Sequence, residues 1–178
     1  ATDSVSIETS TGSVLVEEFT RGASVRSTTG GIDIRRSEGD FTVRSTTGSI
    51  AITSVDGDLE VSSSTGSQRY EEITGDIEAR STTGRIELSD TEGRLWLRTS
   101  TGRQVGADVR LTGDSSFDST TGNIEMDIEN DVDALEFDLS STTGSLRVGA
   151  DRSQRELFLS GTGHTVTGST STGSQHYF

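Results

Sequence analysis

The chain of 178 residues contains no cysteine and no lysine, and no apolar run approaches the roughly 18 residues that a membrane-spanning helix requires. The absence of cysteine excludes disulfides, thiolate metal sites and a cysteine nucleophile. The absence of long apolar runs predicts no membrane insertion by this chain. All 15 basic residues are therefore arginine.

Apolar residues are scarce as well. They make up 28% of the chain, and the formal net charge is −14. A composition this polar and acidic lies close to that of disordered segments, which bury too little apolar surface to fold. The same negative charge disfavours binding to phosphate backbones, so we expect no nucleic-acid partner.

A repeat outweighs this composition. The tetrapeptide Ser-Thr-Thr-Gly, or a close variant, recurs every 18 residues and ends at Gly12, Gly30, Gly48, Gly66, Gly84 and Gly102. Two longer rows follow, and the same glycine recurs at Gly122 and Gly144. A second glycine falls half a period later, at Gly39, Gly57, Gly75 and Gly93. Self-similarity at a short fixed period is typical of solenoid proteins.

Apolar residues two positions apart follow each glycine. Ile50 and Ile52 come after the first glycine of one row, and Leu59 and Val61 come after its second glycine. Period two is the strand period, so each row is expected to form two short strands separated by two turns. Stacked in parallel, the rows would align these residues into ladders around a thin core. We predict an all-β fold, a single-stranded right-handed parallel β-helix of about nine coils, its hand taken from the bias of parallel crossovers.

The chain is expected to form one β-solenoid domain over 1–178. Regular coils cover 9–102, longer coils cover 103–160, and an irregular last coil covers 161–178. Neither end shows a helical or proline-marked cap, so the terminal strand edges are expected to be open. Open ends can stack head to tail, which predicts a homo-oligomer or filament formed through the solenoid ends. Alternatively, flanking sequence outside the given residues supplies the caps.

The repeated tetrapeptide is interpreted as a structural corner. Its glycine would supply the positive φ that turns the chain without a Cβ clash, and its hydroxyls would form ladders between coils. The turn glycines assigned in this way are Gly12, Gly30, Gly48, Gly66, Gly84, Gly102, Gly122 and Gly144. An ice-binding face built from pairs such as Ser27/Thr29 and Ser45/Thr47 is an alternative, although the pairs fall at a corner and not along a strand.

A single tryptophan is the main candidate for ligand contact. In LWLR (95–98) the two leucines fall in the inward phase, so Trp96 is expected to point outwards. An exposed ring among arginines could bind a surface glycan or a protein. Alternatively, the ring lies flat over its neighbours in adjacent coils, Glu78 and Ser116. The binding residues proposed on this face are Trp96, Arg80, Arg94 and Arg98.

Calcium is the one cofactor that the sequence suggests. Asp40, Asp58 and Asp76 follow the second glycine in three consecutive coils, and Asp56 precedes one of these glycines. Neighbouring carboxylates can share a Ca²⁺ ion, which prefers six to eight oxygen ligands. Aspartate is also a favoured turn residue, and the GGxGxD signature of calcium-bound β-rolls is missing. The chain is therefore expected to hold no cofactor, and calcium bound at these acidic turns is the alternative.

No catalytic constellation is visible. Neither His164 nor His176 has a second histidine or a cysteine at metal-ligand spacing. No nucleophile elbow or phosphate-binding loop occurs outside the repeat. We therefore expect no enzyme activity. The alternative is a carbohydrate-active enzyme, which would need a groove beside the longer rows between 103 and 156.

The alternation of STTG-x-I-x-[IVL] with [DE]-G-D-[LIF]-x-V resembles a prokaryotic family of adhesin-type β-strand-repeat domains. The resemblance covers residues 9–160 and is strongest over 9–102. It implies a β-helix at the cell envelope or outside the cell, with a structural or adhesive role and no catalytic residues. A weaker resemblance is to the bactofilins, which are polymer-forming cytoskeletal β-helices. The expected function is a non-enzymatic, adhesin-like structural module, with a glycan- or protein-binding module built around Trp96 as the alternative.

Overall fold

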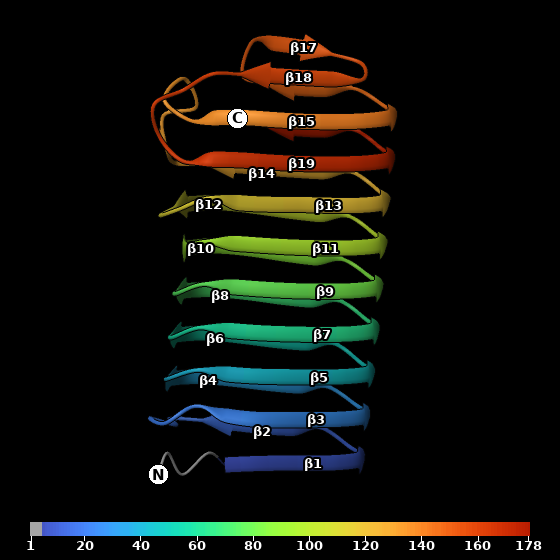
Figure 1. Cartoon of the computed structure of the whole chain (residues 1–178). Helices are drawn as coiled ribbons and strands as arrows, with labels where there is room; N and C mark the ends of the chain where they lie inside the picture. The colour runs from blue at the N-terminus through green and yellow to red at the C-terminus, as the bar shows by residue number, and fades with distance from the viewer. Residues whose placement is uncertain (1–4) are drawn as a thin grey trace.

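Two strands form in each repeat, one on either side of the Ser-Thr-Thr-Gly corner. The computed structural model describes residues 5–178, and the regular elements of this part of the chain are all strands (Figure 1). The first sheet contains β1 (Val5–Thr11), β3 (Ala23–Thr29), β5 (Phe41–Thr47), β7 (Leu59–Thr65), β9 (Ile77–Thr83), β11 (Leu95–Thr101), β13 (Ser115–Thr121), β15 (Glu136–Thr143), β18 (Glu156–Leu159) and β19 (Thr165–Thr172). The second contains β2 (Val14–Glu17), β4 (Ile32–Glu38), β6 (Ile50–Asp56), β8 (Gln68–Thr74), β10 (Ile86–Gly93), β12 (Gln104–Leu111), β14 (Ile124–Ile128), β16 (Leu146–Val148), β17 (Asp151–Ser153) and β20 (Gln175–Tyr177).

Strands of successive coils pair in parallel, offset by one repeat. Ile50 of β6, for example, pairs with Ile32 of β4 and Gln68 of β8. Among the described strands, β17 and β18 alone run antiparallel to their neighbours. In Figure 1 the strands of the first sheet run to the right at the front, and those of the second return at the back while the chain rises, which is a right-handed coil. The predicted parallel β-solenoid is confirmed.

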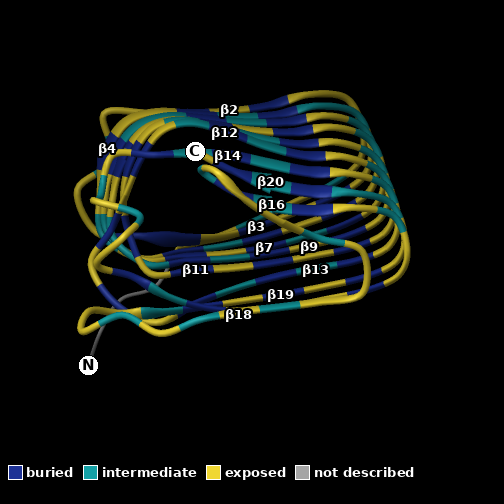
Figure 2. Cartoon of the chain, turned by 90° about the horizontal axis from the view of Figure 1, so that it is seen from above, coloured by how far each residue is buried: buried dark blue, intermediate teal, exposed yellow. Residues whose placement is uncertain are grey.

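The core is a thin layer enclosed by the two sheets (Figure 2). Inward columns hold aliphatic residues in direct register, such as Ile34 and Ile52, which are both 0% exposed. Burying a side chain of this size contributes roughly 1.5–3 kcal/mol. Because a coil has only a few inward positions, ladders of such residues hold the stack together although the chain as a whole is polar.

The second sheet bends at a left-handed residue in six successive coils. These residues are Glu18, Arg36, Ser54, Glu72, Asp90 and Asp108, with φ between 46° and 55°. Two consecutive side chains point outwards at the bend, and the inward phase then resumes at buried residues such as Val55 and Ile73. Each of these coils therefore has a short third side. The prediction of two strands and two turns missed it, because left-handed residues other than glycine leave no clear compositional signal.

Strain at this bend gives a testable effect on stability. Asp90→Gly is expected to stabilise the protein by up to about 1 kcal/mol, because glycine adopts positive φ without a steric penalty. Asp90→Val is expected to destabilise it by about 1–2 kcal/mol, because a β-branched residue fits the left-handed region worst. Urea denaturation measures both changes. Identical midpoints for the three proteins would contradict the left-handed conformation of Asp90.

The last two coils do not stack in chain order. β19 lies between β13 and β15 in the first sheet, and β20 lies between β14 and β16 in the second. The glycine corners follow the same order, because a Cβ at Gly173 would contact Gly122 and one at Gly144 would contact Gly173. Within 161–178, predicted as an irregular last coil, β19 and β20 thus form a regular layer inside the stack (Figure 1). Seven coils follow the chain, and the two layers beyond them are exchanged.

The end of the stack formed by β15 and β16 is covered by two further strands. β18 pairs antiparallel with β15, placing Phe158 opposite Asp138, and β17 pairs antiparallel with β16, placing Arg152 opposite Arg147. These strands interrupt the parallel edge, so the prediction that this end is uncapped is wrong. The cap strands lie within 151–159, where the 18-residue period is lost. Their sequence gives no warning, because the cap contains neither a helix nor a proline.

Candidate ligand-binding face around Trp96

Strand β11 carries Trp96 on the outer face of the first sheet. The neighbours of Trp96 in register are Glu78 of β9 and Ser116 of β13. Leu95 and Leu97 are buried on the opposite face, whereas Trp96 keeps 38% of its surface exposed. The indole therefore points outwards, as strand alternation predicts.

Arg94 holds one side of the indole. Its guanidinium carbon lies 5.2 Å from the Trp96 ring centroid, within the range of a cation–π contact. Arg94 Nε also donates to Asp76 Oδ2 at 2.9 Å, and the backbone N–H of Arg94 donates to Asp76 Oδ1 at 3.0 Å. The side-chain hydrogen bond lowers the pKa of Asp76 and raises the pKa of Arg94. These contacts give the ring a defined orientation before any ligand arrives.

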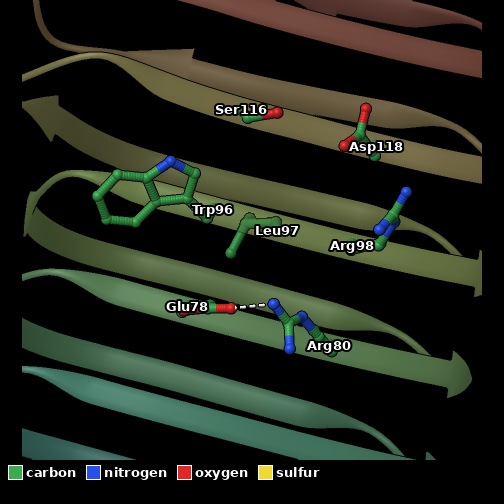
Figure 3. A pocket seen from close by; sticks show the side chains of 7 residues that line it. All are labelled: Glu78, Arg80, Trp96, Leu97, Arg98, Ser116 and Asp118. Carbon is green, nitrogen blue, oxygen red and sulfur yellow. Dashed lines mark ion pairs between the residues drawn. The ribbon is translucent and has the colours of Figure 1, made fainter.

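A shallow depression of about 310 Å³ opens beside the ring (Figure 3). Arg80 forms an ion pair with Glu78, drawn as a dashed line in Figure 3. Arg98 forms no ion pair with any carboxylate of residues 5–178, so its guanidinium donors are available to a ligand. The residues that line the depression are Glu78, Arg80, Trp96, Leu97, Arg98, Ser116 and Asp118.

A second depression, of about 320 Å³, lies over the preceding coils. Trp96 and Glu78 line both depressions, so the indole stands between them. The second one is predominantly acidic and is lined by Asp40, Phe41, Thr42, Asp58, Leu59, Glu60, Asp76, Glu78 and Trp96. Together the two depressions form a trough with the indole at its centre. Carboxylate acceptors lie on both sides of the indole, and guanidinium donors lie on one side.

The structure thus brings together three of the four proposed binding residues, Trp96, Arg80 and Arg98, and places Arg94 against the ring. Sequence reasoning missed Asp118, which occupies the arginine column opposite Arg98. Asp118 ends a row that has 20 residues in place of 18, so a fixed period does not find it. Counting from the next Ser-Thr-Thr-Gly corner would have placed it.

The aspartates proposed as calcium ligands form a hydrogen-bonded ladder. Asp40 Oδ1 accepts the backbone N–H of Asp58 at 3.1 Å, and Asp58 Oδ1 accepts that of Asp76 at 2.9 Å. Asp56 lies outside this ladder, in β6, on the other side of the glycine corner. In the part of the chain that the structure describes, no group of three or more His, Asp or Glu side chains is arranged to hold a metal. The ladder accounts for the spacing of three aspartates, and calcium binding stays a prediction.

The Ser-Thr-Thr-Gly corners have the geometry of a structural turn. All eight assigned glycines have positive φ, between +117° and +157°. The first hydroxyl residue of the tetrapeptide points into the core, as Ser27 (1% exposed) and Ser45 (6% exposed) show. An ice-binding face would need this residue on a flat outer surface next to Thr29 or Thr47. The paired surface that this alternative proposed does not form, because the first hydroxyl column belongs to the core.

Buried glutamines are a second feature that the sequence reasoning missed. Gln68, Gln104 and Gln175 occupy the inward column that isoleucine or leucine fills in neighbouring coils, and none is more than 1% exposed. Tyr70, also buried, donates its hydroxyl hydrogen to Gln68 Oε1 at 2.8 Å, and Tyr177 donates to Gln175 Oε1 at 3.1 Å. The shared sequence pattern, SQRY at 67–70 and SQHY at 174–177, was the signal for the buried glutamine–tyrosine pairs. Burial raises the pKa of both tyrosines, which therefore remain neutral hydrogen-bond donors.

Carboxylates also gather over the third side of the coils, where a depression of about 270 Å³ includes Glu92, Asp108 and Glu129. Glu129 is paired there with Arg110, whose Nε lies 3.1 Å from Glu129 Oε2. This is the nearest counterpart to the groove that the enzyme alternative requires, and that alternative stays a prediction.

No helix in the described residues is long and apolar enough to cross a membrane. Comparison of the chain with protein-family models, curated proteins and solved structures gave no significant match. The resemblance to adhesin-type domains is therefore unsupported beyond the β-solenoid itself. The case for a function depends on the geometry of the Trp96 face.

Proposed function

We propose that this chain is a non-catalytic, adhesin-like module that binds carbohydrate on the trough around Trp96. The observation that carries the proposal is the exposed indole, held by Arg94 and Asp76 between two depressions of a rigid sheet face. An outward tryptophan on a strand could otherwise be an isolated surface residue. Here it lies among ordered donors and acceptors, which is the composition of a binding site.

The chemistry of the trough fits a polyhydroxylated ring. The indole offers an apolar face on which the C–H face of a sugar can stack. Glu78 and Asp118 can accept hydrogen bonds from sugar hydroxyls, and Arg98 can donate them. Because Arg98 is also free to pair with a carboxylate, a uronic acid residue is accommodated as well as a neutral sugar. Because the face is shallow, we expect it to bind an extended glycan chain with moderate affinity. A single sugar should bind more weakly.

Removing the indole tests the proposal. Trp96→Ala is expected to weaken binding of a glycan chain about tenfold or more, because stacking on an aromatic ring contributes on the order of 1.4 kcal/mol. Suitable probes are a neutral oligosaccharide such as cellohexaose and an acidic one such as an oligogalacturonide. Isothermal titration calorimetry measures both proteins. Trp96 is the only tryptophan, so its fluorescence reports occupancy of this face in the unsubstituted chain.

Phe158→Ala is the matched control, because Phe158 is 65% exposed in the cap and lies away from the trough. It should leave affinity and fluorescence response unchanged. Binding that survives Trp96→Ala but is lost in Phe158→Ala would move the site to the cap. An absence of binding by either class of probe would reject carbohydrate recognition on this face.

A location outside the cell or at the cell envelope is part of the same proposal, and its support is the resemblance of the repeat to adhesin-type domains. End-to-end association of the solenoid is a separate prediction. The cap of β17 and β18 disfavours stacking through the C-terminal end, because antiparallel strands do not offer the next coil its parallel register. A protein ligand for the Trp96 face is the remaining alternative, which the same variant would test.

A further inference from the structure

The layer formed by β19 and β20 fills a slot inside the stack. β19 pairs along one edge with β13 and along the other with β15, over Val166 to Thr172 in both cases. β20 pairs in the same way with β14 and β16. The layers on the two sides of the slot do not pair with each other. They present two facing ladders of backbone donors and acceptors, which only a strand–corner–strand segment can satisfy.

The inward side chains of the segment match this slot. Tyr177 is 0% exposed, and its ring centroid lies 5.8 Å from that of Phe117 below and 5.5 Å from that of Phe137 above. Its hydroxyl is bound by Gln175, whose Nε2 donates to the backbone carbonyl of Ser140 at 2.8 Å. The contacts that hold the segment therefore come from residues that lie far from it in sequence.

A short exposed linker joins the segment to the cap. Ser160, Thr162, Gly163 and His164 are exposed. The linker is fastened to the stack by backbone hydrogen bonds, since the N–H groups of Thr162 and Gly163 donate to the carbonyl of Ala134 at 3.0 and 2.8 Å. Its small, exposed residues can absorb a change of backbone direction, which is the property of a hinge.

We propose that β19–β20 is an exchangeable element, and that the partner is a second copy of this chain whose identical slot receives it. Every ladder bond and every contact of Tyr177 and Gln175 would form equally well in the slot of the second copy. The direction of the 160–164 linker would change, and with it the hydrogen bonds from Thr162 and Gly163 to the Ala134 carbonyl. Reciprocal exchange closes a symmetric dimer and leaves no slot empty.

The segment that fills the slot lies far along the sequence from the strands that form it. β19 pairs with β13 at a separation of about 51 residues, whereas consecutive regular coils pair at 18. Closure entropy grows slowly with loop length, so this longer separation weakens filling within one chain by only about 1 kcal/mol. Tethering through a short linker corresponds to an effective concentration of the order of millimolar. Exchange is therefore expected when the protein folds at concentrations that approach this value.

Disulfide trapping tests the exchange, because the natural chain contains no cysteine. Ser116 of β13 and Thr167 of β19 are register partners on the outer face. One preparation carries Ser116→Cys and another carries Thr167→Cys, and the two are mixed, unfolded, refolded together and oxidised. A covalent heterodimer can form only where β19 of one chain lies against β13 of the other. Its yield should rise about tenfold between roughly 30 and 300 μM protein during refolding.

Thr42→Cys and Glu60→Cys provide the matched control. These residues are register partners on β5 and β7, which belong to consecutive coils and have no hinge between them. Their mixture should give no heterodimer beyond random collision. A heterodimer yield for the 116/167 pair that stays at the control level at every concentration overturns the proposal. A yield above the control that increases with concentration supports it, and size-exclusion chromatography should then show a dimer.

Discussion

Gly48→Ala is expected to destabilise the protein by about 3–5 kcal/mol and to lower its melting temperature by roughly 10 °C. Gly48 has φ of +142°, a conformation that residues with a Cβ rarely adopt. A Cβ at this position would also lie 2.6 Å from the carbonyl carbon of Gly30 and overlap its oxygen. The obstacle is the backbone of the preceding coil, which the ladder holds in place, since Gly30 N–H donates to the Thr47 carbonyl at 2.9 Å.

Gly12→Ala is the matched control. Gly12 has the same role in its own coil and φ of +117°, but nothing lies within 4 Å of a Cβ built on it. Its replacement should cost only the strain of positive φ, about 1–2 kcal/mol. Thermal denaturation followed by circular dichroism compares the two variants. Equal losses would show that the stacking clash contributes nothing and that the corner glycines are required for φ alone.

The pair Gly168 and Tyr177 is expected to show coupling in a double-mutant cycle. A Cβ at Gly168 would overlap Gln175 Oε1 and would lie 2.7 Å from the Tyr177 hydroxyl and 2.8 Å from Leu139 Cδ2. Gly168→Val should therefore destabilise by about 2–3 kcal/mol through overpacking. Tyr177→Val should destabilise by about 3–5 kcal/mol, because it leaves a cavity between Phe117 and Phe137.

The double variant should recover about 1 kcal/mol of the summed loss, because Tyr177→Val removes the hydroxyl that the new valine meets but leaves the closer Gln175 amide in place. Part of the loss should remain, since Gln175 Oε1 no longer has the hydroxyl that donates to it. Urea denaturation of the four proteins gives the coupling energy. Simple additivity would mean that Gly168 is not the residue that makes room for the ring.

The regular coils could be predicted from sequence almost completely. Ile50, Ile52, Leu59 and Val61 were placed inwards by strand alternation alone, and all four are at most 2% exposed. The reason is that each inward column repeats the same local pattern, so local rules and the global fold agree. The third side of the coil was not predicted, because the residue type at positions such as Ser54 does not indicate a left-handed conformation.

The candidate site was found in part. Trp96 and Arg98 followed from their outward phase, because phase is a property of a single strand. Two features depend on how side chains from different coils meet: the contact of Arg94 with the Trp96 ring, and the position of Asp118 beside Arg98. Sequence spacing gives the coil to which such a residue belongs. It does not give the direction that a long arginine side chain takes.

By itself, the sequence determined the repeat, the two strands of each coil, the glycine corners and the outward tryptophan. These features depend on strand periodicity and on a backbone conformation that glycine adopts most readily, and both act over a few residues. Only the tertiary structure decided the order of the last layers, the cap and the place of the C-terminal segment. Every coil presents nearly the same backbone edge and the same corner, so local pairing does not favour one stacking order. The order depends on where Tyr177 finds both Gly168 and the rings of Phe117 and Phe137, which the chain brings together from segments distant in sequence.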